Sequence, residues 1–341
     1  MRIAIFGAGL IGRKHAEIAG RNSALAAIVD PNPESRELAD GLGCAHFSTP
    51  EDCLEKCQLD GVIIATPNQL HVTHARQCID KGIPTLIEKP IADKAAHATA
   101  MVQEAEAQGV PILVGHHRRH NAIVQRARKA IEEGALGRIV AASGHFLLYK
   151  PDDYFDVSWR REPGAGPIFI NLIHDIDLLR YFVGEIVEVV AMQSSAARGF
   201  AVEDTASVLL RFETGALGTF SLSDAAVSPW SWEFTAGENA AYPHANAAAY
   251  QISGTHGALS VPDLRFWHHP ETRGWWEPLD ETTLEADHHD PLQKQFEHFC
   301  DVCRGAAPIV AGKEGLRSLM VVEAIKHSAD SGAAVKLSTR D

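Results

Sequence analysis

A glycine-rich segment near the N-terminus has the spacing of a dinucleotide-binding loop. Residues 7–12 read Gly-Ala-Gly-Leu-Ile-Gly, which fits the pattern GxGxxG. The segment follows an apolar stretch and opens a helix-like one, where glycines allow a tight turn and close approach of the backbone to a pyrophosphate. The first turn of the helix then offers free N–H groups to the phosphates. We therefore expect a dinucleotide to contact Gly7, Gly9, Leu10, Ile11 and Gly12.

An acidic residue follows the second apolar stretch, where a dinucleotide-binding fold places its ribose contact. Asp30 comes directly after residues 24–29. A carboxylate there can accept hydrogen bonds from the adenosine ribose, and it would repel the 2′-phosphate of NADP. The next residues, Pro31-Asn32-Pro33, supply no arginine to offset the repulsion, although Arg36 lies nearby. NAD is therefore the expected cofactor, and NADP is less favoured.

A lysine and a histidine are the candidates for acid–base chemistry. Lys89 lies in Glu88-Lys89-Pro90, directly after an apolar stretch, and His174 opens His174-Asp175-Ile176-Asp177 in a helix-like one. Open α/β sheets bind ligands at the carboxyl ends of their strands, which places Lys89 at a reaction site. Oxidation of an alcohol needs a base for the hydroxyl proton, and both side chains can serve. The alternatives are a surface lysine after a strand and a histidine that faces the core.

These segments, together with two others, resemble one enzyme family over essentially the whole chain. Glu88-Lys89-Pro90, Ala65-Thr66-Pro67-Asn68 with His71, and Gly164-Ala165-Gly166 before His174 are similar to the glucose–fructose oxidoreductase / inositol dehydrogenase / MocA family. The resemblance implies NAD(P)-linked oxidation or reduction at a secondary alcohol or carbonyl carbon of a sugar, cyclic polyol or related compound. It implies that Lys89 is the acid–base residue with His174 beside it, and that the Lys89–Pro90 bond is cis. The further cofactor contacts that it implies are Thr66, Pro67, Asn68, His71, Glu88 and Lys89.

The chain departs from the family pattern beside His174. Many relatives carry Asp four residues before this histidine, and this chain carries Ile170. Asn171, three residues before His174, lies on nearly the same face of the predicted helix. An asparagine can hydrogen-bond a substrate hydroxyl but cannot ionise, so Lys89 would carry more of the acid–base work. The departure favours a sugar acid or a dihydrodiol over plain inositol as substrate.

Arginine residues extend the candidate substrate site. Arg118-Arg119 lies in a segment similar to one that relatives place beside the nicotinamide, and a solvated run of charge is the alternative. Arg160 follows Trp159 ahead of the helix that carries His174, and its guanidinium could hold a carboxylate or a polyol. A loop anchor is the alternative there. The expected substrate contacts are Arg118, Trp159, Arg160, Asn171 and His174.

Strands and helices must alternate through the first third of the chain to position these residues. Apolar stretches at residues 2–6, 24–29, 61–65, 85–87 and 112–114 read as strands, with helix-like stretches at 11–19, 33–42, 69–81 and 94–108 between them. This alternation predicts a doubly wound parallel sheet, the Rossmann arrangement. We therefore expect an NAD-binding Rossmann domain over residues 1–120.

The pattern changes after residue 120. Helices are expected at 122–133, 169–182, 291–304 and 313–331, and strands at 137–146, 186–195, 205–213, 216–222 and 233–235. Runs of strands without intervening helices predict an α+β domain over residues 121–341, with a large, mainly antiparallel open sheet. Stretches such as Val208-Leu209-Leu210 are apolar on both alternations. One face of the sheet is therefore expected to meet a second subunit, giving a homodimer or homotetramer.

Composition limits the partners and the compartment. Asp and Glu total 44 against 31 Lys and Arg, a net charge of −13, which disfavours nucleic acid and anionic membranes. The chain has no apolar stretch of about 18 residues, so no membrane span is expected. The N-terminal apolar segment has no cleavage site for a signal peptide. We expect a cytoplasmic protein that acts on a small molecule and holds no metal. Two other functions stay open: an NAD-dependent glycosidase that oxidises transiently, and a non-catalytic NAD-sensing protein.

Overall fold

The computed structural model describes residues 1–338, which form two compact units. Of these described residues, the first unit comprises 1–120 and 289–319, and the second comprises 121–288 and 320–338. The chain passes from the first unit to the second after His120. Residues 289–319, which the sequence had assigned to the second domain, return to the first unit.

A parallel sheet forms the centre of the first unit. Within residues 1–120, six strands lie in the order β3-β2-β1-β4-β5-β6, with every neighbouring pair parallel. Every residue of β1, β4, β5 and β6 is buried, as expected for a sheet covered by helices on both faces. The doubly wound sheet is confirmed. Its strands are β1 (Ile3–Phe6), β2 (Leu25–Val29), β3 (Ala45–Phe47), β4 (Gly61–Ile64), β5 (Thr85–Ile87) and β6 (Ile112–Val114).

Helices connect these strands in sequence. They are α1 (Leu10–Arg21), α2 (Ser35–Leu42), α3 (Pro50–Lys56), α4 (His71–Ile79) and α5 (Ala95–Gln108), with 3₁₀ turns η1 (Asn68–Leu70) and η2 (His117–His120), and α10 (Pro291–Val302) packs on α1. The strand order reverses between β1 and β4, so the loops that follow these two strands lie at the switch point where such sheets bind ligands. The sequence pattern missed β3 and α3, which are too short to show a clear period.

A large open sheet forms the second unit. Its strands in the described residues lie in the order β14-β13-β12-β11-β7-β10-β9-β8-β15, nine in all, and only β7 and β10 are parallel neighbours. The mainly antiparallel sheet is confirmed. The strands are β7 (Ile139–Leu147), β8 (Ile186–Ser194), β9 (Thr205–Phe212), β10 (Leu217–Ser223), β11 (Tyr250–Gly254), β12 (Gly257–Val261), β13 (Arg265–His268), β14 (Asp280–Thr283) and β15 (Val335–Lys336).

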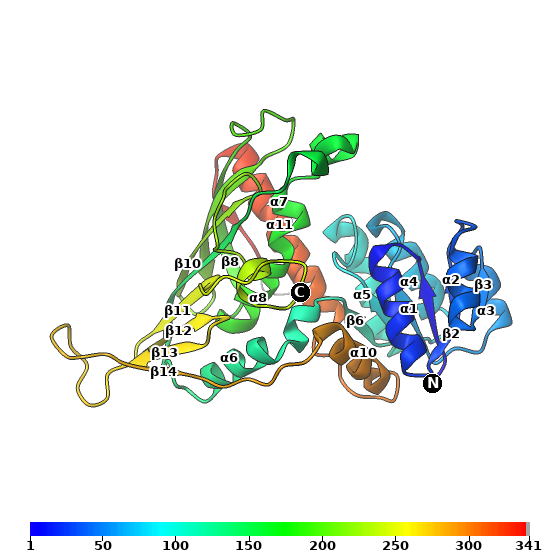
Figure 1. Ribbon diagram of the computed structural model, residues 1–341, viewed down its shortest axis with the longest axis horizontal. Coiled ribbons are helices and arrows are strands. Elements are labelled where there is room, and N and C mark those ends of the chain that lie inside the picture. The colour runs from blue at the N-terminus through cyan, green and yellow to red at the C-terminus, as the bar shows by residue number, and fades with distance from the viewer. Residues whose placement is uncertain (339–341) are drawn as a thin grey trace. The chain divides into compact units, whose positions relative to one another are not determined.

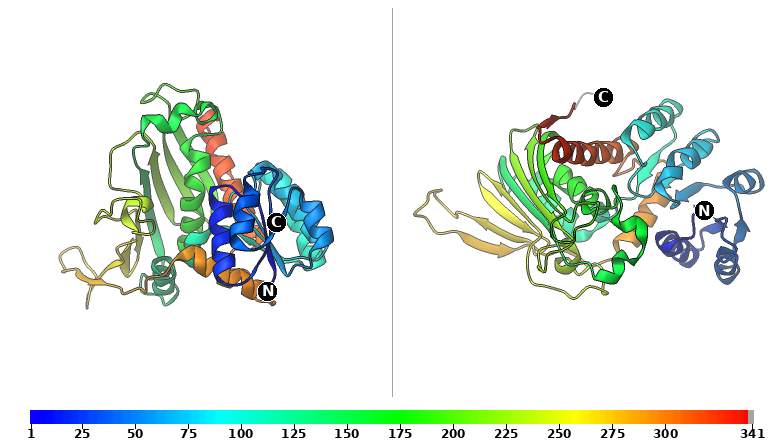
Figure 2. Two further views of the ribbon diagram at one scale, coloured as in Figure 1. Left: turned by 45° about the vertical axis from the view of Figure 1, so that its right-hand side comes forward. Right: turned by 90° about the horizontal axis from the view of Figure 1, so that it is seen from above.

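Helices of the second unit lie over one face of this sheet. Figures 1 and 2 show α8 (Leu172–Val183) and the part of α11 (Gly312–Ser331) that belongs to this unit on the same side of the strands. Burial along β9 alternates accordingly, with Val208 and Leu210 buried and Leu209 57% exposed between them. The remaining elements are α6 (Ala122–Glu132), η3 (Asp152–Asp156), η4 (Ser158–Arg161), α7 (Pro167–Ile170) and α9 (Trp232–Thr235).

Two expected elements of the second unit were wrong. Residues 233–235 form the helical turn α9 instead of a strand, because Ser231 caps it by accepting a hydrogen bond from the Phe234 N–H. The single helix expected over residues 169–182 is two helices, α7 and α8, which meet at Asn171.

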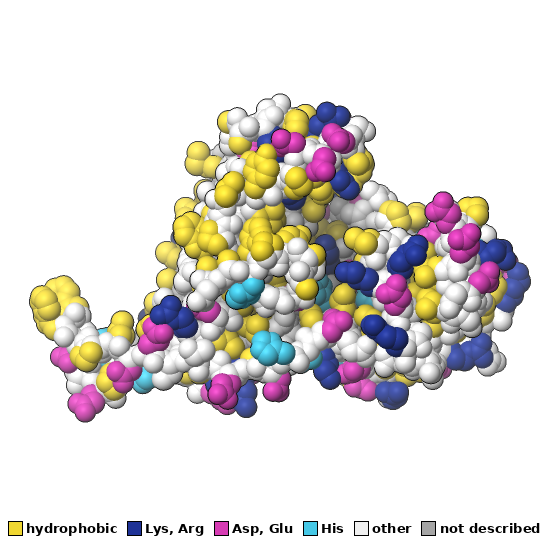
Figure 3. Space-filling model, in the orientation of Figure 1, with side chains coloured by type: hydrophobic (Ala, Val, Ile, Leu, Met, Phe, Trp, Pro, Cys, Tyr) yellow, Lys and Arg dark blue, Asp and Glu magenta, His cyan; other side chains and the backbone are white. Residues whose placement is uncertain are grey.

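The exposed tryptophans lie away from both sheets' cores. Trp232 is buried, whereas Trp275 and Trp276 are 89% and 86% exposed in the loop between β13 and β14. Figure 3 shows hydrophobic side chains at the tip of this loop.

Among residues 1–338, no helix is long and apolar enough to cross a membrane, and no group of three or more His, Cys, Asp or Glu side chains is placed to hold a metal ion.

Candidate active site

The glycine loop between β1 and α1 leaves room for a ligand on one side only. A Cβ atom at Gly7 would lie 2.6 Å from the Ala65 carbonyl oxygen, and one at Gly12 would lie 1.9 Å from the Gly7 carbonyl oxygen. At Gly9, by contrast, no described atom lies within 4 Å of that position. Gly9 caps α1 without a side-chain hydrogen bond. The N–H groups of the first turn are therefore available to a phosphate.

Asp30 lies against this loop. One of its carboxylate oxygens accepts a hydrogen bond from the Ala8 N–H at 2.7 Å, and the other accepts from the Asn32 N–H at 2.8 Å. Each oxygen keeps a lone pair for a further donor, as a ribose hydroxyl would supply. The open space at Gly9 and the placement of Asp30 fit NAD, with pyrophosphate at the start of α1 and ribose at the end of β2.

Glu88 is buried and paired with a residue that the sequence analysis did not single out. The Nε2 atom of His15, on α1, lies 2.8 Å from Oε1 of Glu88, and both side chains are almost fully buried. Burial raises the pKa of Glu88. The hydrogen bond from His15 and the charges of His15, Lys89 and His117 together lower the pKa by more, so it lies below its usual value. Glu88 is therefore an ionised carboxylate that ties α1 to the loop after β5.

Lys89 follows directly after Glu88 at the carboxyl end of β5. Its backbone N–H donates to Oε2 of Glu88 at 3.2 Å, its side chain is half-buried, and the Lys89–Pro90 peptide bond is cis, as the family resemblance implied. The lysine therefore lies at the same edge of the sheet as the glycine loop.

His71 joins the loops after β4 and β5. Its Nε2 lies 2.8 Å from the Thr66 carbonyl oxygen and its Nδ1 lies 2.9 Å from that of Pro90. Burial lowers the pKa of His71, although the two carbonyls and Glu88 oppose this effect. The side chain is 1% exposed. We therefore expect His71 to position Thr66, Pro67 and Asn68 from behind rather than to present itself to a ligand.

Two candidate substrate residues of the second unit, Asn171 and His174, lie at the junction of α7 and α8. Asn171 precedes α8, and its carbonyl oxygen accepts from the His174 N–H at 3.2 Å, so the two residues are one turn apart. Both side chains are half-buried. Upstream, the buried carboxylate of Glu203 accepts from the Ile168 N–H at 3.2 Å and anchors the start of α7.

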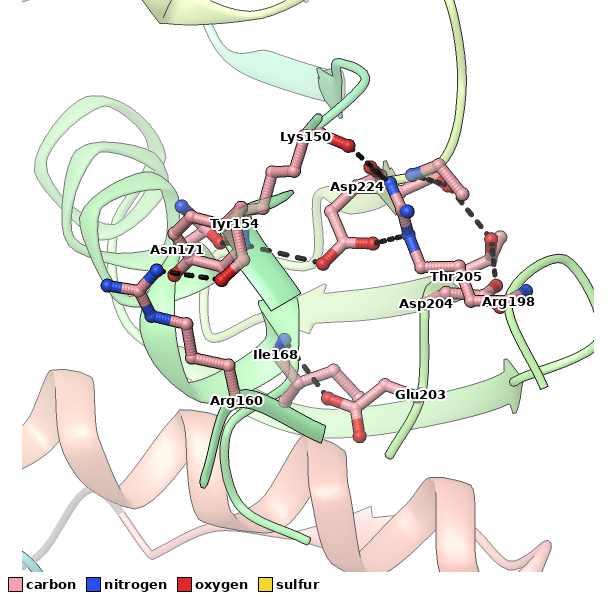
Figure 4. Close-up of polar contacts among 12 residues, drawn as sticks. Lys150, Tyr154, Arg160, Ile168, Asn171, Arg198, Glu203, Asp204, Thr205 and Asp224 are labelled. Carbon is pink, nitrogen blue, oxygen red and sulfur yellow. Dashed lines mark hydrogen bonds and ion pairs between the residues drawn. The ribbon is translucent and has the colours of Figure 1, made fainter. Parts of the chain in front are cut away.

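A lysine missed by the sequence analysis holds the Asn171 side chain (Figure 4). Nζ of Lys150 donates to Oδ1 of Asn171 at 3.0 Å and lies 3.4 Å from Oδ2 of Asp224. Asp224 is in turn paired with Arg198, whose Nε donates to its Oδ1 at 3.2 Å. Lys150 is 8% exposed, and burial lowers its pKa against the opposing charge of Asp224.

Arginine residues expected at the substrate site have different environments. Arg160 lies with its guanidinium carbon 4.1 Å from the centre of the Tyr154 ring and donates to the Tyr154 carbonyl oxygen at 2.7 Å. Trp159 beside it is 53% exposed. Arg118 is buried in η2 of the first unit, and the neighbouring Arg119 pairs with Glu314 at 3.3 Å.

The structure adds two residues to those expected from the sequence. The cofactor candidates lie on or next to the first-unit loops after β1, β2, β4 and β5, and Trp159, Arg160, Asn171 and His174 belong to the second unit. His15 and Lys150 are the residues that were missed. A signal for Lys150 exists, since Lys150-Pro151 follows a strand just as Lys89-Pro90 does. His15 lies inside a helix and carries no such signal.

Comparison with known proteins places the chain among oxidoreductases. Residues 1–116 match the model of the oxidoreductase family with an NAD-binding Rossmann fold, and residues 124–260 match the GFO/IDH/MocA C-terminal domain. The rhizopine catabolism protein MocA of Rhizobium meliloti is 27% identical over 95% of this chain and 93% of its own length. The myo-inositol 2-dehydrogenase of Thermotoga maritima is 26% identical over 99% and 98%.

A solved structure has the same fold. The WlbA dehydrogenase from Bordetella pertussis, in complex with NADH and UDP-GlcNAcA, matches with a TM-score of 0.78 and 28% identity over 99% of this chain and 98% of its own. The Rossmann sheet, its glycine loop and these matches define an NAD-dependent dehydrogenase. The chain belongs to the Gfo/Idh/MocA family of oxidoreductases, as its motifs predicted.

Proposed function

We propose that this dehydrogenase transfers a hydride between NAD(H) and a secondary alcohol or carbonyl carbon of a sugar, sugar acid, cyclic polyol or dihydrodiol. Lys89 is the acid–base residue in this proposal, and His174 assists it. The observation that carries the proposal is the position of Lys89, directly after β5 at the sheet edge that also holds the glycine loop and Asp30. Two of the relatives reported above are named as a myo-inositol 2-dehydrogenase and as a dehydrogenase bound to NADH and UDP-GlcNAcA, which supports the substrate class.

Each residue of the proposed site has a defined task. NAD⁺, when bound, supplies the hydride acceptor. Lys89, in its neutral form, accepts the hydroxyl proton of the substrate. Loss of this proton promotes departure of a hydride from the carbon that bears the hydroxyl. His174 hydrogen-bonds the reacting oxygen and orients it. Glu88, held by His15, keeps the backbone of Lys89 in place. Asn171, Trp159, Arg160 and Arg118 bind the rest of the substrate.

Two alternative functions are less well supported. An NAD-dependent glycosidase would oxidise its substrate only transiently, but two of the three relatives described above are named as dehydrogenases. A non-catalytic NAD-sensing protein would need neither Lys89 nor His174, and both are present. Added NAD⁺ would show no net reduction with either alternative.

A substrate screen tests the proposal directly. Purified protein is incubated with NAD⁺ and sugars, sugar acids, inositols or dihydrodiols, and NADH absorbance is followed. Net formation of NADH with a compound of these classes, lost in Lys89→Ala, is expected. Cleavage of a glycoside without net NADH would support the glycosidase, and binding of NADH without any turnover would support the sensor.

The uncovered face of the second-unit sheet supports a homo-oligomer. Met192, Leu209 and Leu217 are 76%, 57% and 54% exposed on β8, β9 and β10. Leu209 pairs with Val190 on one side and Thr219 on the other, so it lies in the middle of this face. Monomers rarely expose so large an apolar face, and a second copy would bury it. We infer a homodimer or homotetramer that forms through this face. We also infer a cytoplasmic location, because the six free cysteines would stay reduced there.

A further inference from the structure

The hydrogen bond from Lys150 to Asn171 decides which end of the asparagine amide a ligand meets. Nζ of Lys150 lies 3.0 Å from the side-chain oxygen of Asn171. An ammonium group has only donors, so the amide oxygen must be the end that faces it. The amide nitrogen, with its two N–H groups, is then the end left for another partner. It makes no hydrogen bond to a described residue. Asn171 is therefore a donor at this site, not an acceptor.

Neighbouring contacts hold Lys150 in this position. Asp224 lies 3.4 Å from Nζ, and Arg198 donates to the carbonyl oxygens of both Lys150 and Asp224, at 2.7 and 2.6 Å. The carboxylate of Asp224 is shared between Lys150 and Arg198. Figure 4 shows this network on one side of Lys150 and Asn171 on the other. Lys150 is therefore built into the fold as a fixed donor to Asn171.

Arg160 adds a second set of donors to the same cluster. Its guanidinium stacks on the Tyr154 ring, and Nζ of Lys150 lies 5.1 Å from the centre of that ring. One terminal nitrogen donates to the Tyr154 carbonyl oxygen, while the buried Nε has no partner among the described residues. No described carboxylate lies within ion-pair distance of Arg160. The terminal nitrogens of a guanidinium that has no carboxylate partner can bind a ligand carboxylate.

We infer that Arg160 and Asn171, with Asn171 oriented by Lys150, form a donor-only subsite that binds a carboxylate group of the substrate. The inference rests on the proposed function and narrows its substrate class to hydroxy acids such as sugar acids. A carboxylate accepts up to about four hydrogen bonds and neutralises the guanidinium. A hydroxyl group in the same place would leave its own O–H without an acceptor and the charge of Arg160 unpaired. Lys150 is thus a positioning residue for specificity.

Matched ligands test the subsite without turnover. The protein is saturated with NADH, so that an alcohol substrate can bind but cannot react. Calorimetry then compares D-glucuronate, D-galacturonate and D-mannuronate with the corresponding hexoses, which carry CH₂OH in place of the carboxylate. We expect at least one uronate to bind about tenfold or more tightly than its hexose. Pairs that all bind equally, or uronates that all fail to bind, would overturn the inference.

Variants then assign the preference to particular residues. Arg160→Gln and Asn171→Asp should each remove the preference, the second because a carboxylate repels a carboxylate. Arg161→Gln is the matched control, since Arg161 is the next residue, is exposed and touches none of the cluster. Its preference should equal that of the unchanged protein. Retention of the preference in Arg160→Gln and Asn171→Asp would contradict the subsite.

Lys150 is tested by loss and rescue. Lys150→Met frees the Asn171 amide to rotate and should lower the uronate-to-hexose ratio about tenfold, whereas Lys150→Arg keeps a donor facing Oδ1 and should restore most of it. NADH affinity and melting temperature show whether each variant is folded. A ratio unchanged in Lys150→Met would overturn the positioning role. Failure of NADH to bind the unchanged protein would instead contradict the proposed function, so the two failures are distinguishable.

Discussion

His15 and Glu88 form a buried pair that joins the first helix to the loop of the proposed catalytic lysine. His15 is fully buried on α1, and its Nε2 lies 2.8 Å from the Glu88 carboxylate. The same carboxylate accepts from the Lys89 N–H at 3.2 Å. One hydrogen-bonded pair thus connects the element that carries the glycine loop to the residue proposed to move the proton.

Removing His15 should destabilise the protein. His15→Leu leaves the ionised Glu88 buried without its main donor, and the loss of one partner of a buried pair costs about 3 kcal/mol. Urea unfolding measures the change in the free energy of unfolding. His15→Gln, which can still donate to Glu88, is the matched variant and should lose much less. Equal stability of His15→Leu and the unchanged protein would show that the pair contributes nothing.

Asp30 should select NAD over NADP. The carboxylate lies against the glycine loop with lone pairs for the ribose, and it would repel a 2′-phosphate, so NAD(H) should bind about tenfold or more tightly than NADP(H). Asp30→Ser combined with Pro31→Arg should shift the preference toward NADP. Titration calorimetry measures both affinities. Equal affinity of the unchanged protein for the two cofactors would contradict this role.

Lys89 should contribute more to turnover than His174. Lys89→Ala should lower kcat by about 10²–10⁴-fold, the usual loss for an acid–base group, with little change in NAD affinity. His174→Ala should cost less, because Ile170 stands at the position where the family resemblance implies an aspartate partner. Lys89→Arg keeps the charge but cannot act as a base at neutral pH, so it should also be nearly inactive. Substantial activity in Lys89→Arg would mean that another group moves the proton.

Acid should destabilise the first unit through His71. Burial holds the pKa of His71 below its ordinary value of 6.5. Between that value and the lower pKa of the folded state, the unfolded chain binds a proton that the folded chain does not. The contribution of His71 is therefore present above about pH 6.5 and is lost as the pH falls through this window.

Variants separate this effect from that of the other histidines. His71→Gln should flatten the dependence of unfolding free energy on pH below about pH 6.5, whatever its absolute stability. His288→Gln, at an exposed position, is the control and should leave the slope unchanged. A slope that is the same in His71→Gln and in the unchanged protein would show that His71 does not titrate differently on unfolding.

A charge on the open sheet face should dissociate the oligomer. Leu209→Glu places a carboxylate in the middle of the exposed face between Val190 and Thr219, where a second copy would bury it. Light scattering should show a dimer or tetramer for the unchanged protein and a monomer for the variant. Val227→Glu, at a residue that is 91% exposed in a loop, is the matched control and should stay oligomeric. A monomeric unchanged protein would refute the interface.

The sequence alone determined the fold class and the family. The spacing of Gly7, Gly9 and Gly12 after a strand, with Asp30 after the next one, predicted the Rossmann sheet and NAD, because local steric and hydrogen-bonding needs act over short spans of chain. Glu88-Lys89-Pro90 predicted the position of Lys89 for the same reason. Short elements were not predicted correctly from the sequence pattern. The strand Ala45–Phe47 has too few residues for a period, and the Trp232–Thr235 turn is helical because Ser231 caps it.

Only the tertiary structure decided which distant residues meet. His15 and Glu88 are 73 positions apart, Lys150 and Asn171 are 21 apart, and residues 289–319 return to the first unit after the whole second sheet. Neither partner of such a pair has a local pattern that names the other, because the contact depends on how helices and loops pack on the sheets. The orientation of the Asn171 amide follows from one of these contacts, and with it the kind of ligand that the site can accept.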